Sequence, residues 1–107
     1  MSGFDDLKDQ FEKKFAHDQA LRFRAEAKRN RMLGEWAGGL LGHSGAALED
    51  YVKAVIVADF KEAGDEDVFR KIREDFKAAG VDQSDHQIRR HMDEFMAKAM
   101  EQVMSEA

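Results

Sequence analysis

Residue types that carry metal or nucleophilic chemistry are scarce in this chain of 107 residues. It has four histidines, His17, His43, His86 and His91, and no cysteine. No two histidines have the HExxH or i,i+4 spacing that places two ring nitrogens on one helix face for a metal. Without thiols, neither a zinc–thiolate site nor a cysteine nucleophile can form. We therefore expect surface or capping histidines and no metal site.

A glycine-rich run, GGLLGHSG at residues 38–45, invites comparison with phosphate-binding loops. The run lacks the terminal Lys-Ser/Thr of a P-loop and follows a helical pattern instead of a strand. Ser44 lacks the surroundings of a nucleophile elbow. The run is better explained as a helix end and a turn. Because no catalytic constellation is present, we expect that the protein is not an enzyme.

Basic side chains are concentrated in residues 19–33, which hold five bases and one acid. This stretch separates two acidic regions in a chain of formal net charge -5. It could bind an anion, including a nucleotide, or an acidic protein surface. It could equally be a solvated face that pairs with acids of its own domain. The candidate residues for an anion-binding or docking face are Arg22, Arg24, Lys28 and Arg29.

Residues 1–18 combine an apolar stripe with dense charge. Phe4, Leu7, Phe11 and Phe15 share one helical face. A lone helix of this length is marginal in water, so the segment should become helical only where the stripe finds a surface. That surface could belong to the same chain or to another protein. In the second case the segment is a mobile or weakly helical arm.

The rest of the sequence predicts helices with period-3.6 apolar stripes. The first runs over residues 4–41, where Gly34, Gly38, Gly39, Gly42 and Gly45 should loosen and end it. The others cover residues 46–63, 65–79 and 84 onward, with Gly64 and Gly80 as stop signals and a capping box at Ser84-Asp85-His86-Gln87. We expect an all-α fold: residues 1–18 as the arm and residues 19–107 as a small four-helix bundle.

The stripes also predict the core of the bundle. Trp36 should be buried, and so should the methionines of the last helix, which interleave with other apolar residues and so favour core filling over a binding surface. The remaining core candidates are Leu48, Val52, Val55, Ile56, Phe60, Val68, Ile72, Phe76, Ile88, Met92, Phe95, Met96, Ala99 and Val103.

Composition excludes several functional classes. A net charge of -5 does not suit a nucleic-acid-binding protein. No apolar run approaches membrane-spanning length, and the acidic N-terminus does not resemble a signal or transit peptide. The expected location is cytoplasmic, without direct membrane insertion.

Four stretches resemble the zeta subunit of the F-type ATP synthase in alphaproteobacteria: FEKKFAHD, FRAEAKRNRMLGEWA, VADFKEAGDEDVFRKIREDF and MDEFMAKAMEQVM. The resemblance implies a regulatory subunit that inhibits ATP hydrolysis. Its N-terminal segment would insert as a helix between the catalytic alpha and beta subunits, beside the rotor gamma subunit. Carried onto this chain, the resemblance implies that residues 1–18 are this segment, with apolar anchors at Phe4, Leu7, Phe11 and Phe15 and charged contacts at Lys13, Lys14 and Asp18. The protein would then be peripheral at the inner membrane through the synthase.

Two alternative functions remain open from the sequence. The bundle could be a nucleotide-sensing domain with weak or no inhibitory activity, which leaves room for weak ATP or ADP binding although no cofactor is expected. The chain could also be a generic helical protein-interaction adaptor.

Overall fold

The computed structural model describes residues 3–15, 18–61 and 64–106, with the side chains of residues 4, 14 and 15 outside that description. The described residues form five α-helices and no strand. The helices are α1 (Gly3–Phe15), α2 (Gln19–Leu40), α3 (Gly45–Ala58), α4 (Glu66–Ala79) and α5 (Asp85–Glu106). The expected all-α class is confirmed, whereas the described part of the chain has five helices instead of four.

The expected single helix over residues 4–41 is wrong, because α1 and α2 are separate helices. Asp18 is the N-cap of α2, and its side chain accepts a hydrogen bond from Leu21 N at 3.2 Å. A carboxylate in this position satisfies an unpaired amide of the first turn, which favours a new helix start here. The apolar stripe alone could not show this break, because its period continues across it.

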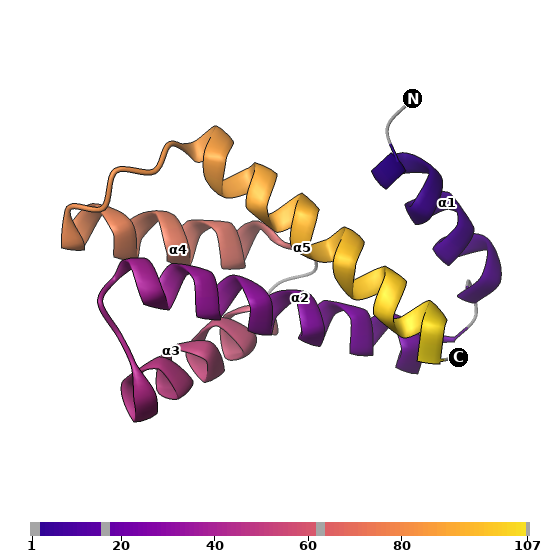
Figure 1. Cartoon of the computed structure of the whole chain (residues 1–107), viewed down its shortest axis with the longest axis horizontal. Coiled ribbons are helices and arrows are strands. Elements are labelled where there is room, and N and C mark those ends of the chain that lie inside the picture. Colours follow the sequence, from indigo (N-terminus) through magenta and orange to yellow (C-terminus); the bar gives the residue numbers. More distant parts are fainter. Residues whose placement is uncertain (1–2, 16–17, 62–63, 107) are drawn as a thin grey trace.

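The long helix α2 is the central element of the fold. It packs extensively against both α3 and α5, while α4 contacts α3 and α5. Figure 1 shows α1 beside the C-terminal half of α5, at the end of the molecule where α2 begins. The N-terminal helix is therefore placed against only one end of the bundle.

Two glycines inside α2 allow α3 to approach closely. A Cβ atom on Gly34 would lie 3.0 Å from Val52 Cα, and one on Gly38 would lie 2.5 Å from Leu48 Cδ1. The expectation that these two glycines loosen the helix is therefore wrong. They remain helical and remove side-chain bulk where two helices meet. Gly42, with φ of 87°, lies in the turn after α2 as expected, and Gly45, with φ of 55°, is the first residue of α3.

Helix α3 is shorter than the helix predicted over residues 46–63. It ends at Ala58 instead of near residue 63, so Gly64 does not directly follow it. Phe60 consequently lies in the turn beyond the helix and is 60% exposed. The prediction that Phe60 is core is wrong, because the helical stripe stops before it.

Local capping signals at α4 and α5 are confirmed. Gly80 adopts the left-handed conformation at the end of α4, with φ of 70°. At the start of α5, Gln87 N donates to Ser84 Oγ at 3.1 Å, and Ser84 N donates to Gln87 Oε1 at 2.8 Å. These reciprocal bonds are the predicted capping box.

The buried side chains form two clusters. The larger joins α2, α3, α4 and the first half of α5, with Trp36 and Phe95 partly buried at its edge. The smaller joins α1, the first half of α2 and the second half of α5. Met92 and Met100 are buried as expected, whereas Met96 and Met104 of the same helix are only partly buried. Only the smaller cluster includes residues of α1.

Candidate partner-binding site

The apolar face of α1 is turned toward the rest of the chain. Phe11 is only 3% exposed, and Leu7 packs partly buried against the same cluster. The other buried members are Ala25 of α2 and Ala99, Met100 and Val103 of α5. Two of the four expected partner anchors are thus covered by the chain's own helices.

The charged residues expected to help α1 bind are differently placed. Lys13 is exposed on α1, and Asp18 is also exposed while it caps α2. Three further candidates, Phe4, Lys14 and Phe15, belong to α1, but their side chains lie outside the described residues. The described contacts therefore place Leu7 and Phe11 together and leave Lys13 facing solvent.

Two of the four docking candidates on α2 are engaged at the end of α5. Arg24 and Lys28 both approach the Glu106 carboxylate, at 3.5 Å and 3.0 Å. The hydrogen bond from Lys28, together with the charges of both bases, holds the pKa of Glu106 below its usual range. This agrees with the alternative that basic residues pair with acids of their own domain. Arg22 is exposed on the same helix.

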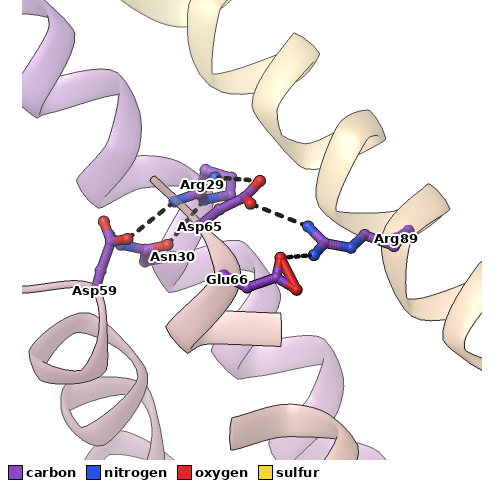
Figure 2. A network of polar contacts seen from close by, with 6 residues as sticks. All are labelled: Arg29, Asn30, Asp59, Asp65, Glu66 and Arg89. Carbon is purple, nitrogen blue, oxygen red and sulfur yellow. Dashed lines mark hydrogen bonds and ion pairs between the residues drawn. The ribbon is translucent and has the colours of Figure 1, made fainter. Parts of the chain in front are cut away.

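Arg29 belongs to a polar network inside the molecule, shown in Figure 2. Its side chain is 5% exposed, and its Nε donates to Asn30 Oδ1 at 2.8 Å. Its guanidinium also approaches Asp59 at 3.5 Å and Asp65 at 4.0 Å. Asn30 Nδ2 in turn donates a hydrogen bond to Asp59 at 2.9 Å. Arg29 is therefore unavailable to a partner while this network is intact.

The network also holds the connection between α3 and α4 against α5. Arg89 donates to Asp65 at 3.0 Å and pairs with Glu66, as Figure 2 shows. Asp65 is the N-cap residue of α4, but its side chain makes no capping bond to the helix. Its carboxylate instead faces Arg89 and Arg29. We interpret the network as a structural device that joins α2, α4 and α5.

An exposed aromatic pair lies near the basic residues and was not identified from the sequence. Phe23 of α2 is 55% exposed and stacks on Phe60, with ring centroids 5.5 Å apart. Val57 of α3 is also largely exposed, at 58%. The sequence feature that could have indicated an exposed Phe23 is its position between Arg22 and Arg24, outside the main apolar stripe. Aromatic side chains, phenylalanine included, are enriched in protein interfaces relative to the rest of the surface.

A surface cavity of about 280 Å³ adjoins α3 and α4. It is lined by Ala58, Lys61, Asp67, Arg70, Lys71, Glu74 and Asp75. Three bases therefore face three acids, and this balance does not favour a polyphosphate over any other ligand. Among the described residues, none from the basic stretch 19–33 lines it. This cavity therefore gives that stretch no nucleotide site. Arg22 instead lines two other surface cavities of about 250 Å³ each, and Glu26 lies beside it in both.

The described residues define a class of protein: a small all-α bundle with an amphipathic N-terminal helix packed on one end. Over residues 3–15, 18–61 and 64–106, no cluster of three or more His, Asp or Glu residues could hold a metal ion. None of the described helices is both long and apolar enough to cross a membrane.

Comparison with known families identifies the particular family. The model of the family described as ATPase inhibitor subunit zeta matches residues 1–102, so the chain belongs to this family. This confirms the resemblance seen in the sequence. Family membership supports a regulatory role as an ATPase inhibitor and implies association with ATP synthase. No curated protein matches the chain.

Proposed function

We propose that this chain inhibits ATP hydrolysis by the F-type ATP synthase through its N-terminal arm, residues 1–18. The arm would insert as a helix at the interface of the catalytic alpha and beta subunits, beside the rotor gamma subunit. Phe4, Leu7, Phe11 and Phe15 would be the apolar anchors. Lys13, Lys14 and Asp18 would supply charged contacts. Residues 19–107 would form the domain that holds the arm near its target.

The observation that carries this proposal is the separation of α1 from α2. The arm holds a short amphipathic helix, and the next helix begins independently at Gln19 with its own cap. Such a helix can change surfaces without melting the bundle. An apolar helix face that enters a groove of a partner is a recurrent mode of recognition. Attachment to the bundle raises the local concentration of the arm once the domain is bound.

The bundle would contact the synthase through exposed residues at the start of α2. Arg22 is exposed beside the Phe23–Phe60 pair, whereas Arg29 is buried. We therefore narrow the expected docking face to Arg22 with Phe23 and Phe60. Arg24 and Lys28 would contribute only if they exchanged Glu106 for a partner acid.

The proposal is tested by ATP hydrolysis of a synthase head stripped of this subunit. Full-length chain should inhibit, and a chain of residues 19–107 should bind without inhibiting. Circular dichroism must first show that the shortened chain is folded. A Lys98→Ala variant of the full chain provides the control, because Lys98 is exposed on α5 and outside both proposed surfaces. Equal inhibition by the full and shortened chains would contradict an inhibitory arm.

A further inference from the structure

The contact between α1 and the bundle has the features of a built groove. Phe11 is 3% exposed between α2 and α5, and the groove side is made of small or flexible residues. Ala25 and Ala99 are buried at this contact, with relative exposures of 1% and 0%. Because their side chains are small, the aromatic ring has room to approach both helices. Met100 is 7% exposed, and Met96 and Met104 are partly buried at the edge. Methionine side chains adapt to irregular apolar surfaces.

A surface pocket opens at the rim of the same contact. A cavity of about 250 Å³ remains between α1, α2 and α5. Its lining combines apolar residues with charged ones: Lys8, Phe11, Glu12, Arg22, Ala25, Glu26, Met96 and Met100. The charged lining residues Lys8, Glu12, Arg22 and Glu26 are all exposed, so the pocket is open to solvent and limits the apolar area that α1 buries. The groove can therefore hold α1 without binding it as firmly as a core helix.

We infer that docking of α1 in this groove is an autoinhibitory latch, which competes directly with insertion of the arm into the synthase. The inference rests on the proposed function. Leu7 and Phe11 are two of the apolar anchors needed for insertion, and both already face the chain's own α2 and α5. One apolar helix face cannot cover two surfaces at once. Inhibition therefore requires release of α1.

The latch predicts that mutations in the groove strengthen inhibition instead of weakening it. If only the released fraction of chains can insert, the apparent affinity is the intrinsic affinity reduced by that fraction. A groove variant that leaves the arm sequence intact raises this fraction. It should therefore make the protein a stronger inhibitor. If the groove instead helped to bind the synthase, the same variant would make it weaker.

The first test compares two groove variants of the full chain, Met100→Ala and Met96→Ser. Met96 is partly buried at the groove edge, so its replacement keeps the test valid if the Met100 variant does not fold. Lys98→Ala is the matched control, because Lys98 is exposed on the same helix. Hydrogen exchange measures protection of the α1 amides, and ATP hydrolysis by the stripped synthase head measures inhibition.

We expect faster exchange in α1 and half-inhibition at a concentration lower by roughly three- to tenfold for the groove variants. The control should match the wild type in both measurements. Unchanged or weaker inhibition by groove variants whose α1 has lost protection would overturn the latch.

A second test prevents release. The chain has no cysteine, so Lys8→Cys with Met96→Cys introduces a unique pair at residues that line the same cavity. A bismaleimide with a disulfide in its spacer would join α1 to α5. The joined chain should lose inhibition, and reduction of the spacer should restore it. The single variant Lys8→Cys, treated in the same way, controls for the modification itself. Full inhibition by the joined chain would contradict the need for release.

The two proposals fail in different ways. Inhibition by a groove variant, when the wild type is weak or inactive, would support both the arm mechanism and the latch. If neither the wild type nor the groove variants inhibit, although hydrogen exchange shows that α1 is released, the arm mechanism is wrong. The latch is then wrong as well, because release of α1 does not control inhibition. If all of them inhibit equally and α1 is unprotected in the wild type, the arm mechanism stands and the latch alone is wrong.

Discussion

Arg29 illustrates how a single charged side chain can serve the fold in place of a partner. Its guanidinium is almost fully buried and faces Asn30, Asp59 and Asp65. Taking a cation out of water is unfavourable unless its partners are present and well placed. The carboxylates around Arg29 therefore matter more for stability than those of exposed ion pairs.

We predict that Asp59→Ala lowers the free energy of unfolding by about 2–4 kcal/mol, because it removes the nearest carboxylate of a buried guanidinium and the acceptor of the Asn30 amide. Chemical denaturation measures this loss. The matched control is Glu49→Gln, which breaks an ion pair with Arg31 whose side chains are both 46% exposed. It should cost much less, because solvent screens this exposed pair. Equal losses for the two variants would contradict a special role for the buried network.

Folding disfavours the charge of Glu26, whereas partners compensate the charge of Arg29. Partial burial and the nearby Asp59 raise the pKa of its carboxyl, against the lowering effect of Arg29 and Arg22. A carboxyl whose pKa is higher in the folded state than in the unfolded state binds protons more readily when folded. Stability is therefore lost as pH rises from the ordinary value through the raised one.

We predict that Glu26→Gln raises the melting temperature slightly at pH 7, because folding disfavours the charged form of the wild-type carboxyl. The gain should disappear below the ordinary carboxyl pKa of 4.5, where the wild-type side chain is neutral in both states. Thermal unfolding at the two pH values is the measurement. The effect should be small because Glu26 is partly solvated. A gain that persists at acidic pH would indicate a cause other than charge.

At the scale of elements, the contact between α2 and α3 depends on glycines within a helix. Glycine normally weakens a helix compared with alanine, through backbone entropy. At Gly34 this disadvantage is outweighed, because a methyl group there would meet the Val52 backbone. A methyl group on Gly39 would meet no other element of the described chain within 4 Å, so only the disadvantage remains there.

We predict opposite effects for the same substitution at these two positions. Gly34→Ala should destabilise the protein by about 1–3 kcal/mol, because α3 must shift away from α2. Gly39→Ala should stabilise it by about 0.5–1 kcal/mol. Denaturant titration of both variants measures the difference. Stabilisation by both would mean that α3 can adjust at no cost.

At the scale of the whole molecule, the two apolar clusters make α1 a peripheral unit. The larger cluster holds α2, α3, α4 and α5 together, while α1 contributes Phe11 and Leu7 only to the smaller one. A helix of 13 residues is marginal by itself in water. Loss of its anchor should therefore release α1 while the larger cluster remains folded.

We predict that Phe11→Ala removes hydrogen-exchange protection from α1 and leaves the amides of α4 protected as in the wild type. Local openings of weakly held elements have lower free energies than global unfolding, which is the reason for the difference. Lys13→Ala, an exposed change on the same helix, should alter neither region. Parallel loss of protection in α1 and α4 would show instead that the molecule unfolds as one cooperative unit.

The sequence by itself determined the features that depend on neighbouring residues. The helical class, the apolar stripes, the Ser84–Gln87 capping box and the left-handed Gly80 were all predictable, because each follows from side-chain period or from contacts within one turn. The family resemblance was visible in the same way. Phe11 could be identified as an anchor but not assigned to a surface.

Only the tertiary structure decided which helix faces lie opposite each other. It buried Arg29, which looked like part of a basic docking face, and exposed Phe60, which looked like core. It also placed Gly34 against α3 and the α1 stripe against α2 and α5. These outcomes depend on contacts between residues far apart in the chain. A single helical period contains no information about them, because the same stripe fits more than one apolar surface.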